Sequence, residues 1–186
     1  MISVITPTLN AAATLDRCIE SVSGQRVQTE HLFIDGGSTD GTKAMLHEFI
    51  DAPGSGIYEA QNIGIRAASG DWVYFLGADD YVFPGAFREL QKRLDETQCQ
   101  WVHFRIRIET EKAMSPKLFA AQQQAFMYRK SLLLDYGLMD ESVGLCADVR
   151  FNQKLESAGE LCERIDQCVA VFSDIGHLKG RLNART

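Results

Sequence analysis

The sequence predicts an α/β protein in which a mostly parallel central sheet is flanked by helices and followed by a smaller, irregular C-terminal part. Three observations support this expectation. Apolar runs alternate with helix-like segments over roughly the first hundred residues, which is typical of consecutive βαβ units. A later segment alternates apolar and polar residues, as a strand with one wet face does. No repeat, low-complexity tract or linker divides the 186 residues, and this length suits one domain.

Three short and mostly apolar runs predict the buried strands of the parallel part. These runs are ISVIT at 2–6, HLFID at 31–35 and WVYFL at 72–76. Helices are expected between them, because apolar residues recur there at helical spacing. The corresponding stripes are Leu15, Ile19 and Val22; Met45, Leu46, Phe49 and Ile50; and Ala60, Ile63 and Ala67 within 59–69. The run PGAFRELQKRL at 84–94 predicts a further helix.

The second half is predicted to be less regular. The run QWVHFRIRIE at 100–109 places Val102, Phe104, Ile106 and Ile108 on one face, which indicates an antiparallel or edge strand. The remaining expected elements are a strand that runs into a helix at 123–137, a helix at 147–158 and one or two late strands at 161–172.

The composition is acidic, with 25 Asp and Glu residues against 19 Lys and Arg and a formal net charge of −6. This balance argues against a protein that grips nucleic acid by its phosphates, although a local patch or a metal ion can still hold a small anion. The N-terminus has no signal-peptide pattern, and no run of about 18 apolar residues predicts a membrane span. Five scattered cysteines indicate reduced, mostly buried thiols in a cytosolic protein, with a Cys162–Cys168 bridge as the less favoured alternative.

Polar residues follow three of the predicted strands. They lie at Pro7–Asn10, Asp35–Ser38 and Asp79–Asp80. Ligands of parallel sheets bind beyond the carboxyl ends of the strands, so we expect these carboxylates to converge on one rim. The adjacent acids at 79 and 80 repel each other, and a hard cation such as Mg²⁺ or Mn²⁺ would offset their charge. The sequence leaves open the alternative that both acids only cap the helix at 84–94.

The glycine-rich run DGGSTDGT at 35–42 does not have the spacing of a phosphate loop. It lacks both the Gly-Lys-Ser/Thr of a P-loop and the GxGxxG of a dinucleotide fold. We therefore interpret it as a turn in which Ser38, Thr39 or Asp40 caps the next helix. This interpretation leaves Asp35 without a structural role.

Four stretches occur in an order and spacing that resemble family 2 glycosyltransferases. They are SVITPTLNAAATLDRCIESV, FIDGGSTDGT, GIYEAQNIGIRAASGDWVYFLGADD and GLMDESVGLCADVRF, and together they span roughly residues 2–155. The likeness is greatest to the bacterial branch that builds exopolysaccharides and cell-surface glycans. It implies a GT-A-like fold, with a nucleotide-sugar-binding half at about 1–98 and an acceptor and catalytic-base half at about 99–186. The activity that it implies is inverting transfer of a sugar from a nucleotide-diphospho-sugar donor.

The resemblance also implies roles for individual positions. TPTLN matches a loop that lines the nucleotide site, Asp35 the aspartate that recognises the base or ribose, and Asp148 the general base. GADD matches the metal-binding DxD-like motif of the family. The implied nucleotide-sugar-binding residues are Pro7, Thr8, Asn10, Asp35, Gly37, Ser38, Tyr58, Asn62 and Asp79. The implied ligands of Mg²⁺ or Mn²⁺ are Asp79 and Asp80.

Departures from the family pattern keep a second function open. Gly77 stands where the first DxD position is often acidic, and Ala147 stands where a Glu often precedes the base. The chain also stops early for the family. A non-catalytic nucleotide-sugar-binding or scaffold protein of the same fold is therefore the alternative to an enzyme. The QxxRW motif of processive synthases is absent, which favours the addition of a single sugar.

The resemblance implies a glycan or lipid-linked acceptor and a cytoplasmic protein that contacts the inner membrane face only transiently. The basic tail HLKGRLNART at 177–186 has two interpretations. Its side chains His177, Lys179 and Arg181 could cover the diphosphate as a lid, or the segment could be a disordered tail, which we favour.

Overall fold

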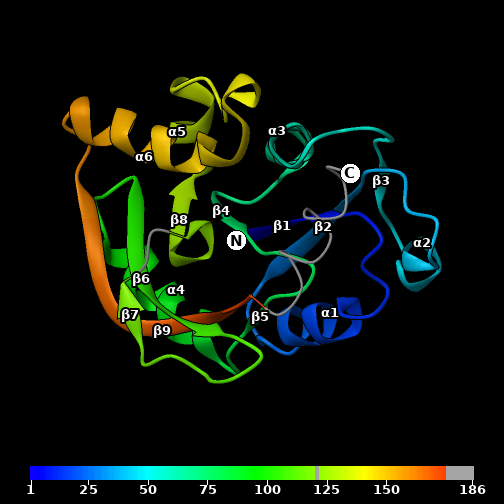
Figure 1. The fold of residues 1–186 in the computed structure, drawn as a ribbon. Coiled ribbons are helices and arrows are strands. Elements are labelled where there is room, and N and C mark those ends of the chain that lie inside the picture. The colour runs from blue at the N-terminus through cyan, green and yellow to red at the C-terminus, as the bar shows by residue number, and fades with distance from the viewer. Residues whose placement is uncertain (120–121, 175–186) are drawn as a thin grey trace.

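The computed structural model describes residues 1–119 and 122–174, and the basic tail lies outside them. In this part of the chain nine strands form one curled sheet in the order β3-β2-β1-β4-β8-β6-β9-β5, with β7 attached to β6 (Figure 1). The strands are β1 (Ile2–Thr8), β2 (Thr29–Asp35), β3 (Ile50–Asp51), β4 (Trp72–Phe75), β5 (Tyr81–Val82), β6 (Trp101–Glu109), β7 (Leu118–Phe119), β8 (Phe126–Arg129) and β9 (Cys162–Ser173).

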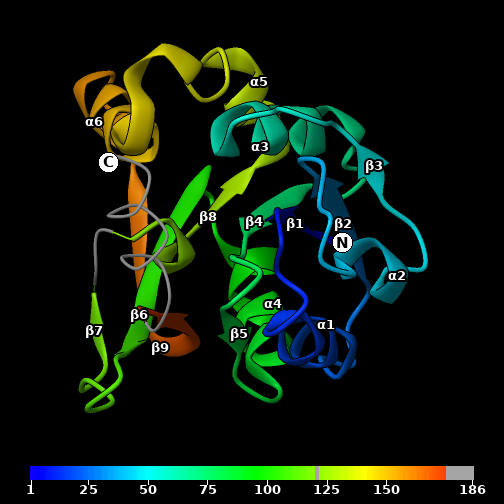
Figure 2. The ribbon, with the colours of Figure 1, turned by 45° about the vertical axis from the view of Figure 1, so that its right-hand side comes forward.

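Helices cover the sheet from two sides. Figures 1 and 2 show α3, α5 and α6 together above the sheet and α1 and α4 below it. The helices are α1 (Leu15–Ser23), α2 (Thr42–Met45), α3 (Ile57–Ala67), α4 (Ala86–Glu96), α5 (Lys130–Asp135) and α6 (Ala147–Ser157), with 3₁₀ turns η1 (Gln123–Ala125) and η2 (Glu141–Cys146). The core between these layers is apolar and continuous.

The N-terminal half contains the predicted parallel sheet. Strand β1 pairs in parallel with both β2 and β4, and β2 pairs in parallel with β3. Residues 2–6 of β1 are all buried, as expected for a strand covered on both faces. The register opposes Thr8 to Asp35 and Ile5 to Phe75, so the three loops that follow these strands leave from one edge of the sheet.

The second half of the sheet is mixed rather than parallel. Strand β8 is antiparallel to β4 and β6, whereas β6 and β9 are parallel. Strand β6 has the alternation expected for 100–109, with Val102, Phe104 and Ile106 buried, but it lies inside the sheet and not at an edge. The late segment is a single twelve-residue strand, β9, with register shifts around Arg105 of β6.

The prediction of a helix over 45–50 is wrong. Helix α2 ends at Met45, Leu46 has an extended backbone, and Ile50 begins β3 instead. Ile50 pairs with Ile34, so the segment supplies backbone partners to the outer edge of β2. Edge pairing and the β preference of isoleucine outweigh the helical spacing of the apolar residues here.

The exposure of two sets of residues also differs from the expectation. In α3 the inward residues include the polar pair Gln61 and Asn62, whereas Ala67 is exposed. All five cysteines are free, but only Cys18 is buried and Cys146 is exposed. Burial raises the pKa of the Cys18 thiol to about 12, which keeps it protonated and unreactive.

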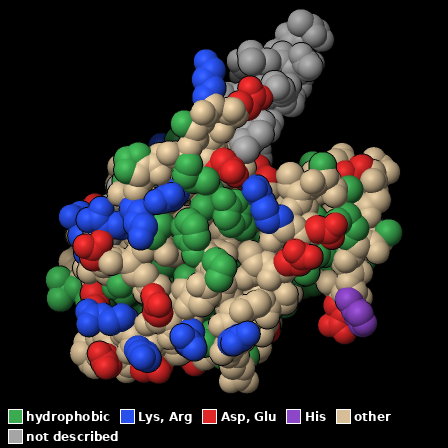
Figure 3. Space-filling view, turned by 90° about the horizontal axis from the view of Figure 1, so that it is seen from below, with side chains coloured by type: hydrophobic (Ala, Val, Ile, Leu, Met, Phe, Trp, Pro, Cys, Tyr) green, Lys and Arg blue, Asp and Glu red, His purple; other side chains and the backbone are tan. Residues whose placement is uncertain are grey.

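No helix in the described ranges has both the length and the apolar composition needed to cross a bilayer. The face seen from below carries Lys, Arg, Asp and Glu side chains around a small apolar cluster (Figure 3). Charges of both signs alternate on this face, so it carries no uniform basic surface.

Candidate active-site cleft

A cleft of about 920 Å³ lies beyond the carboxyl ends of β1 and β4. Its walls come from the loop after β1, the start of α3, the loop after β4, the 3₁₀ turn η1 and the turn η2. Of the predicted site residues it is lined by Pro7, Thr8, Asn10, Tyr58 and Asp79. The cleft therefore joins segments from both halves of the chain.

Asp35 lies behind the cleft wall and ties two loops together. Its side chain is fully buried, and it accepts hydrogen bonds from the backbone N–H groups of Gly37 (3.0 Å) and Ser38 (2.8 Å). The hydroxyls of Ser38 (2.6 Å) and Thr8 (3.1 Å) also donate to it. Burial by itself would raise the pKa of Asp35, but these hydrogen bonds lower it below its ordinary value. Asp35 thus remains ionised and holds Thr8, which does line the cleft.

The loop after β1 is joined to the glycine-rich turn by side chains. The Asn10 N–H donates to Ser38 Oγ (2.9 Å), and Asn10 Oδ1 accepts from the Thr39 N–H (2.9 Å). These bonds hold Asn10 in the left-handed region, with φ of 51°. The N-cap of α2 is Gly41 and not Ser38, Thr39 or Asp40, although Asp40 accepts from the N–H of Thr42, the first residue of the helix (3.0 Å). Gly37 and Ser38 thus shape the cleft through Asp35 and Asn10 without lining it.

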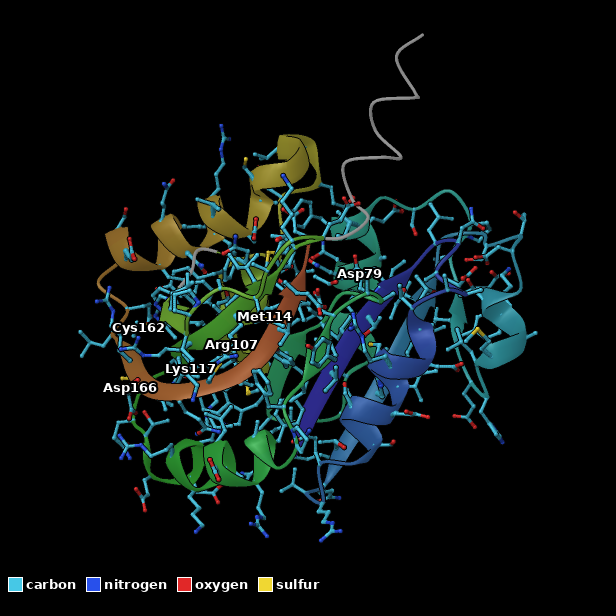
Figure 4. All side chains as sticks on the ribbon, turned by 60° about the horizontal axis from the view of Figure 1, so that its bottom comes forward. Asp79, Arg107, Met114, Lys117, Cys162 and Asp166 are labelled. Atoms are coloured by element: carbon cyan, nitrogen blue, oxygen red, sulfur yellow. The ribbon has the colours of Figure 1, made fainter. Side chains whose placement is uncertain are left out.

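Asp79 and Asp80 have different surroundings. Asp79 lines the cleft, and Figure 4 shows it at the end of the sheet where β1 finishes. The Asp80 carboxylate is instead fully buried and accepts from the Gly77 N–H (3.1 Å), Gln124 Nε2 (2.6 Å) and the Ser173 N–H (2.7 Å). Burial first, and then the charge of Asp79, raises the pKa of Asp80 to about 7. Asp80 therefore braces the loop from inside the protein, in contrast to the metal-ligand role expected for it.

This bracing explains the glycine at position 77. A Cβ atom on Gly77 would lie 2.5 Å from Asp80 Oδ2 and 2.9 Å from Asp79 Oδ1. An acidic residue at this position would require the carboxylates of Asp79 and Asp80 to shift. The loop is also held from outside, because Arg17 Nη2 donates to the backbone oxygen of Asp79 (2.9 Å) and Arg17 pairs with Glu109 (3.2 Å).

Asp148 does not line the cleft, but it is hydrogen-bonded to Tyr58, which does. The Tyr58 hydroxyl donates to Asp148 Oδ1 (2.9 Å), and the Tyr58 ring lines the cleft. Burial, followed by the negative charge of Asp148, raises the pKa of Tyr58 far above its ordinary value. Tyr58 is therefore a permanent donor, and it orients the half-buried carboxylate of Asp148 at the start of α6.

Asn62 lies outside the cleft, contrary to the expectation that it lines the nucleotide site. Its Nδ2 donates to Met139 O (2.9 Å) and Glu141 Oε1 (2.9 Å), and its Oδ1 accepts from the Met139 N–H (3.0 Å). These three bonds pin the segment that leads into η2 onto α3. The Asn62 amide provides hydrogen-bond partners to a neighbouring backbone segment, and this structural role could not be read from its sequence motif.

The sequence reasoning missed a buried amide pair in the cleft wall. Gln61 Nε2 donates to Gln123 Oε1 (2.7 Å), and Gln123 Nε2 donates back to Gln61 Oε1 (3.1 Å). Gln61 is 2% exposed and Gln123 is 9% exposed, and both line the cleft. The available signal was the polar pair Gln61 and Asn62 beside the apolar residues on the inward face of α3. Leu9, Ile57 and Glu141 were also missed.

The cleft suits a divalent cation only with help from a ligand. Among residues 1–119 and 122–174, no three His, Cys, Asp or Glu side chains converge as a preformed metal site. Mg²⁺ and Mn²⁺ commonly use one or two carboxylates together with phosphate oxygens. Asp79 supplies one carboxylate inside a cleft large enough for a nucleotide, so the residues present fit a cation bound jointly with a diphosphate.

The model of the family described as Glycosyl transferase family 2 matches residues 3–147. A PGL/p-HBAD biosynthesis glycosyltransferase of Mycobacterium bovis is 39% identical over 97 residues, which are 45% of this chain and 37% of that protein. The chain therefore spans well under half the length of this relative.

Two solved structures share the fold. TarS 1–349 from S. aureus, in complex with UDP-GlcNAc, has a TM-score of 0.81 at 17% identity and covers 95% of this chain and 59% of its own. The mannosyltransferase PcManGT from Pyrobaculum calidifontis, in complex with GDP-Man and Mn²⁺, has a TM-score of 0.76 at 18% identity and covers 99% and 60%. These likenesses confirm the GT-A-like fold.

Proposed function

This chain belongs to glycosyl transferase family 2, and we propose that it transfers a single sugar, with inversion, from a nucleotide-diphospho-sugar to an acceptor hydroxyl. Structural neighbours bind UDP-GlcNAc and GDP-Man, which supports a donor of this class. A glycan or lipid-linked acceptor of surface polysaccharide synthesis is our proposal for the second substrate. It agrees with the PGL/p-HBAD biosynthesis named for the Mycobacterium bovis relative.

The observation that supports this proposal best is one cleft lined by Asp79 and by Tyr58, whose hydroxyl donates to Asp148. Asp79 follows β4 in the half assigned to the donor, at about 1–98, and Asp148 begins α6 in the half assigned to the acceptor, at about 99–186. A donor that lies along the loops after β1 and β4 would direct its reactive end toward the start of α6.

The proposed reaction is one in-line displacement. The acceptor oxygen forms a bond to the anomeric carbon as the bond from that carbon to the diphosphate oxygen breaks. The acceptor proton goes to the Asp148 carboxylate, and the nucleoside diphosphate leaves with the electron pair. Since Tyr58 occupies Asp148 Oδ1, the other carboxylate oxygen is the one that takes the proton.

Asp79 is the residue that we propose for holding Mg²⁺ or Mn²⁺ together with the donor phosphates. When bound, such an ion offsets the charge that develops on the departing diphosphate. Arg17 holds the backbone of Asp79, and Asp80 anchors the loop to Ser173, so the loop is rigid before any ligand arrives.

The test combines binding and turnover. Calorimetric titration with UDP, GDP and dTDP, with and without Mn²⁺, identifies the base and the metal requirement. Hydrolysis of the matching nucleotide-sugar then reports turnover. We expect Asp148→Asn to lower turnover by a factor on the order of a hundred or more while nucleotide binding is retained. Asp95→Asn on the exposed face of α4 is the matched control.

The alternative is a non-catalytic nucleotide-sugar-binding or scaffold protein. Ala147 supports it, because it is 1% exposed and adds no second carboxylate beside Asp148. Nucleotide binding that does not depend on metal, with no turnover for any donor in a panel of nucleotide-sugars, would favour this alternative and exclude the transferase.

A further inference from the structure

A second cavity, of about 610 Å³, lies on the other side of η2 from the cleft. It is enclosed by α3, α6 and the segment between α5 and η2, which Figures 1 and 2 show grouped above the sheet. Three cationic side chains line it, namely Arg66, Arg150 and Lys154. In a chain with a net charge of −6, such a grouping is a local exception.

These cations are not neutralised by ion pairs within the described residues. None of the ion pairs formed there includes Arg66, Arg150 or Lys154. Lys154 Nζ donates to the backbone oxygen of Tyr136 (2.7 Å) and lies 6.0 Å from the centre of the Tyr136 ring, and neither contact brings a negative charge to it. The carboxylates of Asp140 and Glu141 also line the cavity, so three cations face two carboxylates there. Hydrogen bonds from Ser142, and then the positive charge of Arg150, lower the pKa of Asp140 below its ordinary value.

Helix α6 lines this cavity but does not line the cleft. Ala147, Arg150, Phe151 and Lys154 recur at the spacing of one helical face, and all four line the cavity. Asp148 lies two positions from Arg150, on a different face, where Tyr58 binds it. The proposed base and the cations are thus close in sequence but lie on different faces of α6.

The wall between the two hollows is held rigidly. Glu141 lines both of them, and Asn62 fixes Glu141 and Met139 with three hydrogen bonds. Leu138, in the same segment, has φ of 67°, a left-handed conformation that costs energy for a residue with a branched side chain. This hollow is lined by cations and bordered by a strained backbone segment. We interpret it as a ligand-binding site and not as a gap left by the packing of helices.

We propose that this cavity binds a phosphate or diphosphate group carried by the acceptor. Two guanidinium groups and an ammonium group match the several oxygens of such an anion, and guanidinium binds phosphate in a bidentate manner. The first turn of α6 also borders the cavity and adds the positive end of a helix dipole. An acceptor anchored here would present its hydroxyl across η2 to Asp148.

The identity of the ligand rests on the proposed transfer reaction, but the existence of an anion site does not. The first test is therefore calorimetric titration with inorganic pyrophosphate in EDTA, so that no divalent cation contributes from the cleft. We expect Arg66→Gln/Arg150→Gln to weaken binding by at least about tenfold. The matched control Arg88→Gln/Lys92→Gln removes two exposed charges from α4 and should bind within about twofold of the wild type.

Equal weakening in both double variants, or no binding at concentrations on the order of 10 mM, overturns the anion site. Thermal unfolding of each variant excludes misfolding as the cause. Hydrolysis of the nucleotide-sugar without acceptor should be unchanged in Arg66→Gln/Arg150→Gln. If pyrophosphate binds as expected but no donor is ever turned over, the anion site stands and the transferase proposal fails.

A second arm identifies the source of the phosphate. Glucose 1-phosphate should compete with pyrophosphate, whereas glucose should not. Cosedimentation with phosphatidylglycerol vesicles, compared with phosphatidylcholine vesicles, tests a lipid headgroup. Vesicle binding that depends on Arg66 and Arg150, without competition by glucose 1-phosphate, would assign the cavity to the membrane and overturn the acceptor assignment.

Discussion

The Tyr58 hydroxyl donates a 2.9 Å hydrogen bond to Asp148 Oδ1 and so joins the first turn of α3 to the first turn of α6. This bond connects the donor half of the chain to the acceptor half at the point where we place the chemistry. It also selects which oxygen of the carboxylate remains available to a substrate.

Tyr58→Phe should therefore lower kcat more than it weakens donor binding. The phenyl ring keeps its place in the cleft wall, but the carboxylate loses the donor that orients it. A hydrogen bond to a charged group contributes about 1.5–3 kcal/mol, so we expect a decrease in kcat on the order of tenfold or more. Ser157→Ala, which removes an exposed hydroxyl that donates to Gln153 O and lines neither hollow, is the control. An unchanged kcat in Tyr58→Phe would remove the positioning role.

Gly77→Ala should destabilise the protein. The added Cβ would lie 2.5 Å from Asp80 Oδ2, and overpacking of this kind costs about 1–3 kcal/mol of unfolding free energy. Gly56→Ala is the matched control, since its Cβ would contact nothing within 4 Å and its φ of −72° suits alanine. Urea unfolding of the three proteins gives the measurement, and equal stability of both variants would contradict the inward orientation of Asp80.

Asp79→Asn should impair metal-dependent nucleotide binding, whereas Asp80→Asn should lower thermal stability. Asp79 lines the cleft, so its variant should lose the increase in nucleotide affinity that Mn²⁺ produces while its thermal midpoint stays close to the wild-type value. Asp80 accepts hydrogen bonds from three N–H donors inside the protein. The amide of an asparagine at this position would turn its own N–H group toward at least one of these donors, so we expect a lower thermal midpoint. Calorimetry and thermal unfolding separate the two, and a reversed pattern would assign the metal to Asp80.

Two groups should give the stability opposite pH dependences. Burial lowers the pKa of His31 from 6.5 to about 3, so the unfolded chain binds the extra proton and stability rises with pH across that interval. Burial, aided by Asp79, raises the pKa of Asp80 from 3.8 to about 7, so the folded chain binds the extra proton and stability falls as pH rises. Between about pH 5 and 6.5 the two slopes oppose each other.

Replacing His31 should make the pH dependence that Asp80 gives to the unfolding free energy measurable. In EDTA, we expect the unfolding free energy of His31→Gln to fall by up to about 1.4 kcal/mol per pH unit from about pH 5 to 6.5. The wild type and the control His47→Gln, an exposed position, should change much less. Urea unfolding at several pH values tests this. A stability of His31→Gln that does not fall over this interval would show that Asp80 does not retain a proton, and parallel curves for all three proteins would show that His31 has no depressed pKa.

The parallel half of the fold could be predicted because its signals are local. Mostly apolar runs such as 2–6 and 72–76 favour burial, and their alternation with helices favours a parallel sheet. The same local signals failed at 45–50, where pairing of Ile50 with Ile34 depends on a strand that is distant in sequence. They also missed that β6 lies inside the sheet, because its neighbours β8 and β9 come later in the chain.

The sequence by itself determined which side chains could do chemistry and which loops carry them, because residue type and the ends of strands are properties of the chain. Only the tertiary structure decided how those side chains are used. It turned Asp80 inward and left Asp79 in the cleft, it placed Asn62 behind the wall and Gln61 in it, and it gave Asp148 its donor in Tyr58. The physical reason is that a buried polar atom takes whichever partner the packed elements bring to it, and those elements come from all parts of the sequence.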